Sequence, residues 1–267
     1  MEYIARINPV YFAAMHCFAA TSDPRHYLNG ISIEPHPDSG VIIMASDGHH
    51  MGVIHDPDGW VAERIVVGDV SRQLIEACKG KLPKRGKPAK RKGEKHDIPA
   101  IPPQRLWISG TGALLDWNGA GEKPPESPFD AQVIYADRIS LIDSKPVNWR
   151  QVLPTKREAP TEMPLVNLSL LASVYEAAKV LGHGADYSAA CRLDVADGKI
   201  VAQLIHSTLR DRFVAIVMPM RDGPRGELLP KAFMPKQKPR LQFSSDGSLI
   251  DGAAMDVQAP AAEPAGA

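Results

Sequence analysis

A short apolar strand followed by a capped amphipathic helix occurs three times in this chain of 267 residues. The three copies read YIARINPVYFAAMHCFAATSD, RIVVGDVSRQLIEACKG and LVNLSLLASVYEAAKVLG. Such a repeat indicates that one supersecondary unit is used several times, which restricts the fold more than any single motif does. Asn8, Asp69 and Asn167 are the expected N-caps, because their side-chain oxygens can accept hydrogen bonds from the first helical turn.

Three short β-rich runs follow each of these helices. They read ISIEP, VIIMAS and HHMGVIH after the first helix, RLWISG, ALLDW and QVIYAD after the second, and CRLDV, KIVAQLI and RFVAIVM after the third. Asp/Gly turns separate the runs, as expected between antiparallel strands. The sequence therefore predicts three β-α-β-β-β units, at roughly residues 3–60, 63–143 and 163–221, in an α+β fold with helices on one face of antiparallel sheets.

Two segments depart from this pattern. From Lys79 to Lys95 there are nine Lys or Arg residues and one acid, Glu94, mixed with Gly and Pro. This composition cannot bury enough apolar surface to order itself, so we expect a mobile basic loop over residues 79–103. Residues 223–267 are rich in Pro and Ala and are expected to be mostly flexible, although KPRLQFSSDGSLIDG could add a strand or a docking segment.

Overall charge and cysteine content indicate what the protein can bind and in which compartment we expect it. Lys and Arg number 31 against 31 Asp and Glu, so any site for a polyanion must be local. The three cysteines are far apart and lack CxxC spacing, which is typical of reduced thiols and predicts no disulfide. The N-terminus has neither a secretion signal nor a membrane-spanning run. We expect a soluble, cytoplasmic protein that does not bind membranes.

The sequence shows no catalytic constellation. Asp47, His49, His50, His55 and Asp56 could suggest a metal site or a hydrolase, but they fit a turn between two strands, and no second cluster has ligand spacing. Neither a G-x-S-x-G elbow nor a GxxxxGK[ST] phosphate loop is present. We therefore expect a protein that is not an enzyme and that has no metal and no cofactor.

Three pieces of the sequence resemble landmarks of one family, and they occur in that family's order. They are DPRHYLNGISIEP with IIMASDGHHMGVI, then IDSKPVNWRQVLP, and finally RFVAIVMPMR. All three are similar to segments of the bacterial DNA polymerase III beta subunit, the DNA sliding clamp. In such clamps each domain consists of two β-α-β-β-β units, helices line a central hole and sheets form the outer wall.

The resemblance implies a shortened domain organisation. Residues 1–143 would correspond to the clamp's middle domain, 144–162 to a linker, 163–222 to the second half of the last domain, and 223–267 to an added extension. The family's first domain and the first half of its last domain have no counterpart here. Closure of a ring would then require a partner subunit or the extension to complete the partial domain.

The resemblance also implies a groove for the peptide tails of DNA polymerase and of other replication or repair proteins. The matching residues are Leu28, Ser46, Gly48, His49, His50, Met51, Pro146, Val152, Ile216, Val217, Met218, Pro219 and Met220. His50 and Met51 replace the family's usual Arg and Leu, which should alter peptide preference and could make binding sensitive to pH near about 6.5. Without the resemblance, the same residues are ordinary core positions of adjoining strands.

Double-stranded DNA is the second partner that the resemblance implies. Sliding requires diffuse attraction to phosphates rather than readout of bases. The candidate contacts are Arg25, His26, Tyr27, Arg72, Lys79, Lys84, Arg85, Lys87, Lys90, Arg91, Lys92 and, on the third helix, Lys179. The resemblance further implies a homo-oligomer and a clamp loader. An alternative is a clamp homologue that never closes a ring and competes for polymerase tails or docks on a host clamp.

Overall fold

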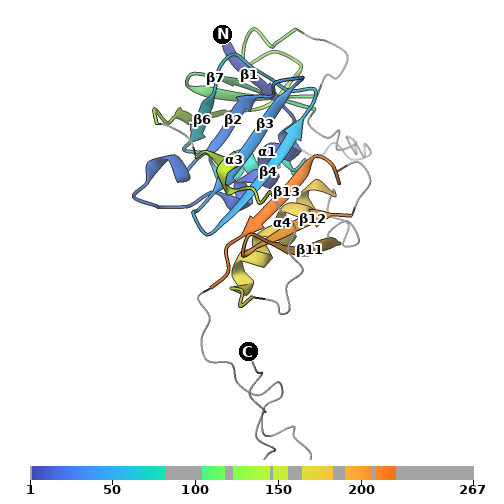
Figure 1. The fold of residues 1–267 in the computed structure, drawn as a ribbon. Helices are drawn as coiled ribbons and strands as arrows, with labels where there is room; N and C mark the ends of the chain where they lie inside the picture. The colour runs from blue at the N-terminus through green and yellow to red at the C-terminus, as the bar shows by residue number, and fades with distance from the viewer. Residues whose placement is uncertain are drawn as a thin grey trace, which may run out of the picture. The chain divides into compact units, whose positions relative to one another are not determined.

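Two antiparallel sheets and a few short helices make up the computed structural model (Figure 1), which describes residues 2–81, 104–117, 123–144, 147–155, 164–182, 190–205 and 209–220. The predicted basic loop beyond Lys81, including Lys84, Arg85, Lys87, Lys90, Arg91 and Lys92, and the extension 223–267 lie outside the described residues. In chain order the elements are β1 (Tyr3–Ile7), α1 (Pro9–Met15), η1 (His16–Phe18), η2 (His26–Leu28), β2 (Ile31–Pro35), β3 (Val41–Ser46), β4 (His50–Asp56), β5 (Trp60–Val61), β6 (Ile65–Gly68), α2 (Arg72–Cys78), β7 (Arg105–Ser109), β8 (Gly112–Asp116), β9 (Val133–Arg138), β10 (Ser140–Leu141), α3 (Trp149–Val152), α4 (Leu168–Leu181), β11 (Cys191–Ala196), β12 (Lys199–Leu204) and β13 (Phe213–Val217).

The first two units exchange their leading strands. One sheet has the order β5-β1-β7-β8-β9, and the other begins β10-β6-β2-β3-β4. Strand β1, which leads into α1, therefore pairs with β7 of the second unit, and β6, which leads into α2, pairs with β2 of the first. The two orders correspond strand by strand. The repeat expected from the sequence is thus also a repeat of the strand topology.

The third unit extends the larger sheet. Strand β13 pairs with β4, and β12 and β11 follow it to the edge of the sheet. The short strand expected before the third helix is absent: residues 164–167 precede α4 and form no strand. The two earlier leading strands each join the sheet of the companion unit, and among the described residues the third unit has no such companion.

Two of the three predicted helix caps are confirmed. Oδ1 of Asn8 accepts a hydrogen bond from the N–H of Val10 at 2.9 Å, and Oδ1 of Asn167 accepts from Ser169 at 3.0 Å. The prediction of Asp69 is wrong. Helix α2 is capped by Ser71, whose Oγ accepts from Leu74, whereas Asp69 has a φ of 49° and its carboxylate accepts from Ser140. Asp tolerates this left-handed conformation, so the chain turns once more before the helix begins.

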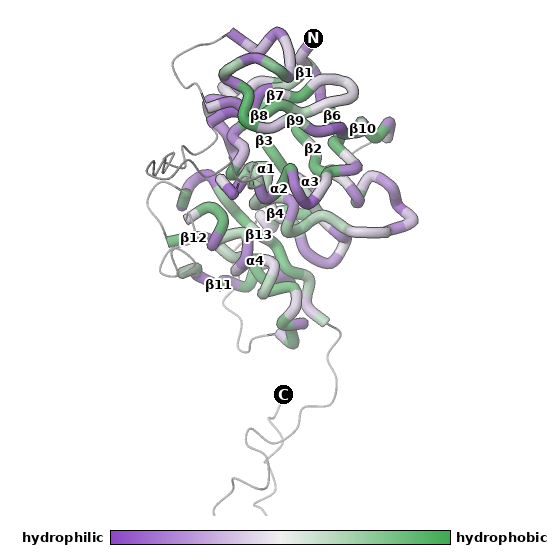
Figure 2. Tube along the Cα trace, turned by 180° about the vertical axis from the view of Figure 1, so that it is seen from behind, coloured by the Kyte–Doolittle hydropathy of each residue, from purple (hydrophilic) through white to green (hydrophobic). Residues whose placement is uncertain are grey.

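One main core joins the helices to both sheets. Phe12 of α1, Leu74 of α2 and Ala178 of α4 belong to the same buried cluster as Ile33 of β2 and Leu106 of β7. Helices as short as α1 and α2 depend on such packing for their stability. In Figure 2 the interior strands β3 and β13 carry apolar stretches, whereas many connecting loops are hydrophilic. None of the described helices is long and apolar enough to cross a membrane.

Candidate functional site

The pairing of β4 with β13 brings together two segments that are far apart in the sequence. His50 lies opposite Val217 and Met51 opposite Ile216. Beyond the end of the ladder, the N–H of Met218 donates to the carbonyl oxygen of His49 at 2.9 Å. The two strands run side by side in Figure 1. The turn between β3 and β4 therefore lies next to the Met218–Met220 segment, as the predicted groove requires.

Two side chains hold the turn, the hydroxyl of Ser46, which accepts from the N–H of Gly48 and donates to the carbonyl of His50, and the carboxylate of Asp47. Oδ1 of Asp47 accepts from the N–H groups of His49 and His50 at 2.8 Å and lies 2.7 Å from Nδ1 of His50. Burial opposes the charge on Asp47, but these hydrogen bonds prevail and lower its pKa below the ordinary 3.8. Gly48 has a φ of 89°, a conformation that favours glycine. The geometry leaves His49 exposed and His50 buried.

The linker lies over the outer face of the larger sheet and is fixed there by polar contacts. Glu34 of β2 is buried, and its Oε1 accepts from Nε1 of Trp149 at 3.0 Å and from Nη1 of Arg150 at 2.6 Å. Arg64 pairs with the other oxygen of the same carboxylate. At the far end of α3, Nζ of Lys199 donates to the carbonyl of Val152 at 2.9 Å. These contacts hold the linker against the β4–β13 region.

A small apolar cluster contains residues from all three predicted segments. Met51 of β4 and Ile216 of β13 are buried in it, and Val152 of the linker packs against it. Strands β3 and β12 complete its floor with Met44 and Val201. The structure thus brings together the turn, the linker and the last strand, although they are remote in sequence.

Much of the predicted groove is interior, and a smaller part is accessible. Leu28, Ser46, His50 and Val217 are buried, and Leu28 belongs to neither apolar cluster. Pro146 lies outside the described residues. Gly48, His49 and Met220 are exposed, with Met220 at 50%, and Val152, Met218 and Pro219 are half-buried. We call Gly48, His49 and the Met218–Met220 segment the rim, and we call the buried members of the predicted groove beside them the floor.

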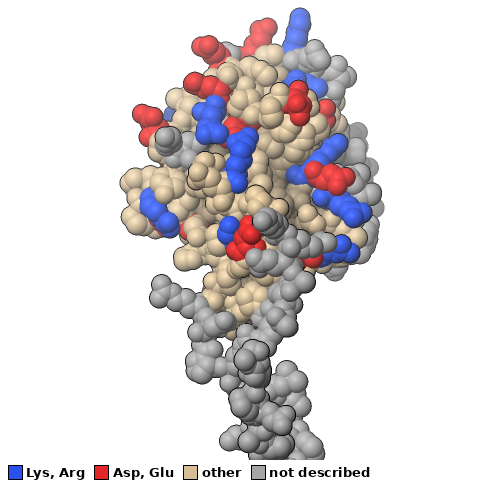
Figure 3. All heavy atoms as spheres, viewed as in Figure 1, with Lys and Arg blue, Asp and Glu red and all other residues tan. Residues whose placement is uncertain are grey.

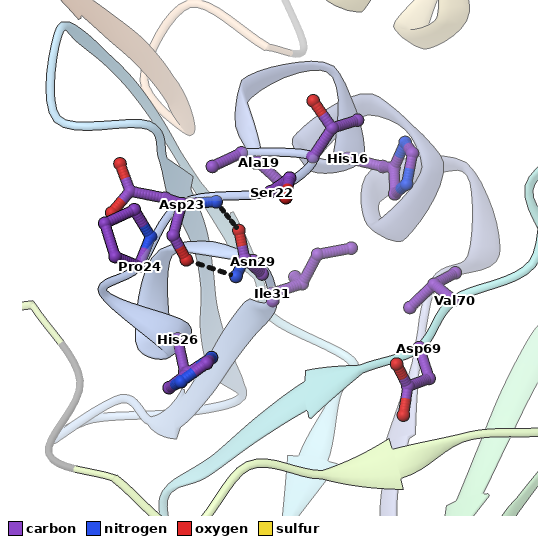
Figure 4. Close-up of a pocket in the computed structure, with 13 residues that line it drawn as sticks. His16, Ala19, Ser22, Asp23, Pro24, His26, Asn29, Ile31, Asp69 and Val70 are labelled. Carbon is purple, nitrogen blue, oxygen red and sulfur yellow. Dashed lines mark hydrogen bonds between the residues drawn. The ribbon is translucent and has the colours of Figure 1, made fainter.

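Two hollows in the surface lie near this region without coinciding with it. One, of about 410 Å³, opens at the other end of the β4–β13 ladder between Val53, Phe213 and Val214, with Arg210 and Arg212 beside it. The other, of about 610 Å³, lies beneath the loop that carries His26 (Figure 4). Asn29 shapes that loop, since its side chain both accepts from the N–H of Asp23 and donates to the carbonyl of Asp23.

Several of the predicted DNA contacts already have partners within the chain. Arg25 forms two hydrogen bonds of 2.9 Å with Asp23, and Lys79 donates to Glu76 at 3.0 Å. His26 and Tyr27 lie in the short helical turn η2, with His26 exposed. Arg72 is exposed on α2, and Nζ of Lys179 lies 5.6 Å from the ring centre of Tyr175 on α4. On the face seen in Figure 3, positive and negative side chains are interspersed.

Sequence reasoning missed the residues that position the linker. Glu34, Arg64 and Lys199 were not predicted, because their partners lie far away in the sequence. The sequence did contain one indication. Glu34 is an acid in a β-rich run whose other residues are typical of a core, and a buried acid normally has a partner. Among the described residues no group of three or more His, Cys, Asp or Glu side chains could hold a metal ion.

Paired β-α-β-β-β units that exchange leading strands, with helices packed against two antiparallel sheets, define an α+β fold of the DNA-clamp class. The comparison with solved structures identifies which clamps share it. The chain matches the beta clamp of H. pylori in complex with diflunisal with a TM-score of 0.50 at 10% identity, over 83% of this chain and 67% of that one. It has the fold of the bacterial DNA polymerase III beta subunit and is shorter.

Two further clamps show the difference in length. DNA polymerase III subunit beta from Borrelia burgdorferi matches with a TM-score of 0.46 at 12% identity, over 83% of this chain and 64% of that one. The DNA polymerase sliding clamp from Bacillus subtilis matches with a TM-score of 0.45 at 13% identity, over 83% and 65%. The chain therefore spans about two thirds of the length of these clamps. No protein-family model and no curated protein sequence matches it.

Proposed function

We propose that this protein is a non-enzymatic, sliding-clamp-like processivity factor. It holds duplex DNA and tethers DNA polymerase, or another replication or repair protein, by binding a short peptide of that partner. The observation that carries the proposal is the hydrogen bond from Met218 to His49, because it places the accessible methionines beside the exposed turn. The clamp-type fold supports the same function.

The rim offers what a peptide needs for attachment. Met218, Pro219 and Met220 present apolar side chains at the end of β13, and the N–H of Met220 is held by the carbonyl of Leu165 at 2.8 Å. A peptide with one or two large apolar side chains can bury them against such a rim, while its backbone bonds to polar groups of the turn. Methionine is flexible, which suits a site that accepts varied tails.

Tethering acts through effective concentration. A polymerase held by its tail rebinds the primer end instead of diffusing away, and this gain requires no strong contact with the polymerase body. Binding of DNA needs only diffuse attraction, to which the exposed Arg72 of α2 and the half-buried Lys179 of α4 contribute. The predicted basic loop would add to this attraction.

Peptide binding tests the proposal directly. A fluorescent peptide carrying a clamp-binding motif should bind the full chain, and the double variant Met218→Asp, Met220→Asp should reduce its affinity at least a hundredfold. The matched control is Phe129→Asp, because Phe129 is 95% exposed and lies in the loop before β9. The proposal fails if the double variant binds the peptide as well as the control does.

A second function is favoured by the incomplete third unit. A protein that does not encircle DNA could still bind polymerase tails, and it would then act as a decoy or an adaptor for a host clamp. Retention on circular DNA distinguishes the two functions. A closed ring stays on a nicked circle and leaves when the circle is cut, whereas a decoy binds the peptide and is not retained on either form.

A further inference from the structure

Three side chains that can carry positive charge stand in a row on the outer face of the larger sheet. Phe213 lies opposite Ile54, and the N–H of His55 donates to the carbonyl of Arg212 at 2.8 Å, so Arg212 stands opposite His55. Residues opposite each other in an antiparallel pair place their side chains on the same face. The ring of His36 lies against that of His55, with the ring centroids 4.3 Å apart. The row therefore crosses the sheet from the turn after β2 to the start of β13.

This row borders the hollow of about 410 Å³ at the Phe213 end of the β4–β13 ladder, which we call the ladder-end pocket. Its apolar bottom consists of Ile42, Val53 and Val214, from three neighbouring strands. These side chains belong to, or pack against, the small cluster beneath the linker, whereas the helices pack into the main core on the other face of the sheet. Arg210 and Gln203 also line the pocket. It is thus an apolar hollow with polar and basic walls.

One turn holds both imidazole rings in place. The N–H of His36 donates to the carbonyl of Gly40 at 3.0 Å and closes the turn between β2 and β3. Nδ1 of His36 accepts from the N–H groups of Asp38 and Ser39 at 3.2 and 3.4 Å, so Nε2 of this ring carries a proton that it can donate. Nε2 of His55 lies 2.8 Å from the carbonyl oxygen of Ser39, which can only accept. The wall that the two rings form is therefore preorganised.

The two arginines of the pocket have no counter-charge in the described part of the chain. Arg210 and Arg212 are exposed, and neither forms an ion pair with a described residue. Among the described residues that line the pocket, Asp211 is the only acid, against two arginines and two histidines. Like charges that face each other across two strands repel. A bound anion would relieve this repulsion.

We infer that the ladder-end pocket binds a phosphate monoester that carries a small apolar group. The guanidinium groups of Arg210 and Arg212 bind the phosphate oxygens, because their forked donors match the geometry of such an oxyanion. Nε2–H of His36 donates a further hydrogen bond, and the apolar group lies on the bottom of the pocket. A monoester has a charge of about −1.5 to −2 at pH 7, which suits two arginines better than the single charge of a carboxylate.

The pocket is separate from both surfaces of the proposed function, and the inference goes beyond that function. Four residue steps along β4 separate Ile54, beside the pocket, from His50, beside the rim, which is about 14 Å at about 3.4 Å per residue. The candidate DNA contacts Arg72 and Lys179 belong to helices, and the helices pack on the other face of the larger sheet. The ligand is therefore a small molecule that needs neither the peptide nor the DNA.

Calorimetric titration of the full chain with phenyl phosphate tests the inference. The dissociation constant should be below about 1 mM, and inorganic phosphate should bind less tightly, because it has no group for the apolar bottom. The double variant Arg210→Gln, Arg212→Gln should raise the constant for phenyl phosphate at least about tenfold. The matched control, Lys123→Gln with Arg138→Gln, removes the same charge from exposed positions outside the pocket and should leave the constant unchanged. Equal losses in the two double variants would overturn the inference.

Two single variants examine the walls of the pocket. Asp211→Asn removes the acid between the arginines and should lower the dissociation constant, because no negative charge then opposes the phosphate. His36→Phe keeps a ring against His55 and removes the Nε2–H donor, so it should raise the constant about threefold. If Asp211→Asn weakens binding instead, the phosphate does not lie beside the arginines and the inference is overturned.

The chemistry of the ligand and its position are measured separately. Methyl phenyl phosphate keeps the ring but has one charge, like a DNA phosphate, and should bind less tightly than phenyl phosphate; equal binding would overturn the assignment to a monoester. Displacement of phenyl phosphate by a DNA duplex would assign the arginines to nucleic acid and would also overturn it. In the unaltered protein, phenyl phosphate should shift the backbone amide NMR signals of Asp38, Ser39 and Arg212, and shifts confined to other residues would contradict the position. Peptide affinity of the arginine double variant should stay unchanged, so failure here is separate from failure of the proposed function.

Discussion

The N–H of Met218 donates to the carbonyl oxygen of His49 at 2.9 Å, one residue beyond the last pair of the β4–β13 ladder. This bond joins the end of the last strand to the turn between β3 and β4. It fixes how far the side chains of Met218 and Met220 stand from the exposed His49. It is the main-chain bond that joins the Met218–Met220 segment to the turn, and a second bond, from the N–H of Met220 to the carbonyl of Leu165 at 2.8 Å, holds the end of that segment.

Substitution Met218→Pro removes that donor and should weaken peptide binding about tenfold. The reason is that the rim loses its attachment to the turn, while the unfolding free energy falls by only about 1 kcal/mol, the net worth of one hydrogen bond. Fluorescence anisotropy with the labelled peptide measures the first effect, and urea unfolding measures the second. Met218→Leu keeps the N–H and the apolar volume, so it should bind nearly as well as the original. Equal binding by the two variants would contradict the role of this bond.

Glu34 holds the linker, and its removal should loosen the linker more than the sheet. In Glu34→Ala, Nε1 of Trp149 and the guanidinium groups of Arg64 and Arg150 all lose their acceptor. Both arginines are about half exposed and can turn to solvent, so we expect a loss of about 1–3 kcal/mol rather than the full cost of an uncompensated buried charge.

Limited digestion with trypsin measures how firmly the linker is held, through the rate at which the linker is cleaved. Cleavage after Arg150 should become faster in Glu34→Ala, while cleavage elsewhere in the described part of the chain changes little. Glu34→Gln keeps one acceptor oxygen and should fall between the two proteins. If Glu34→Ala and the original chain are cut after Arg150 at the same rate, Glu34 does not hold the linker.

The repeat and its strands were predictable because they depend on local patterns. Asn8 and Asn167 stand directly before apolar helical stripes, and a short continuous apolar run such as VIIMAS is typical of a strand buried on both faces. Short elements that tertiary contacts create were not predictable, among them β5, β10 and α3. The extra turn at Asp69 depends on Ser140, which is 71 residues away in the sequence.

The candidate site was predictable only in part, for a related reason. Resemblance indicated which segments meet, and the structure places Met51, Val152 and Ile216 in one cluster. Which of the predicted residues are floor and which are rim depends on the depth of each strand within the sheet, and no local pattern encodes that depth. His50 and Val217 are interior for this reason, whereas His49 and Met220, their near neighbours, are exposed.

Asp56 should make stability depend on pH. Burial raises the pKa of its carboxyl above the ordinary 3.8, although the N–H groups of Asn8 and Asp58 donate to it; the nearby charge of Asp58 also raises this pKa and that of His55 lowers it. A raised pKa in the folded state means that the stabilising contribution is complete below pH 3.8 and is lost as pH rises through the raised value. Above that value the carboxyl is ionised, and it lowers the unfolding free energy by an amount that no longer changes with pH.

The variant Asp56→Asn keeps an acceptor oxygen and has no charge to bury. Its unfolding free energy, measured with urea from pH 3 to pH 8, should therefore rise relative to that of the original chain as the pH rises above 3.8, and then stay level. Asp143→Asn is the control, since Asp143 is exposed and is not among the groups that shift the pKa of Asp56. A difference between Asp56→Asn and the original chain that does not change with pH would contradict the assignment.

Salt dependence of DNA binding distinguishes free cations from paired ones. Each phosphate contact contributes about 0.9 to the slope of log K against log salt concentration. Arg72 is exposed on α2, so Arg72→Gln should reduce that slope by about 0.9. The guanidinium of Arg25 is held by Asp23, and its pKa is raised by that hydrogen bond, so Arg25→Gln should change the slope less. Anisotropy of a labelled duplex between 50 and 200 mM salt measures both slopes. A larger change for Arg25→Gln would mean that Arg25 leaves Asp23 for the DNA, and that the loop before η2, rather than the face of α2, makes the principal contact.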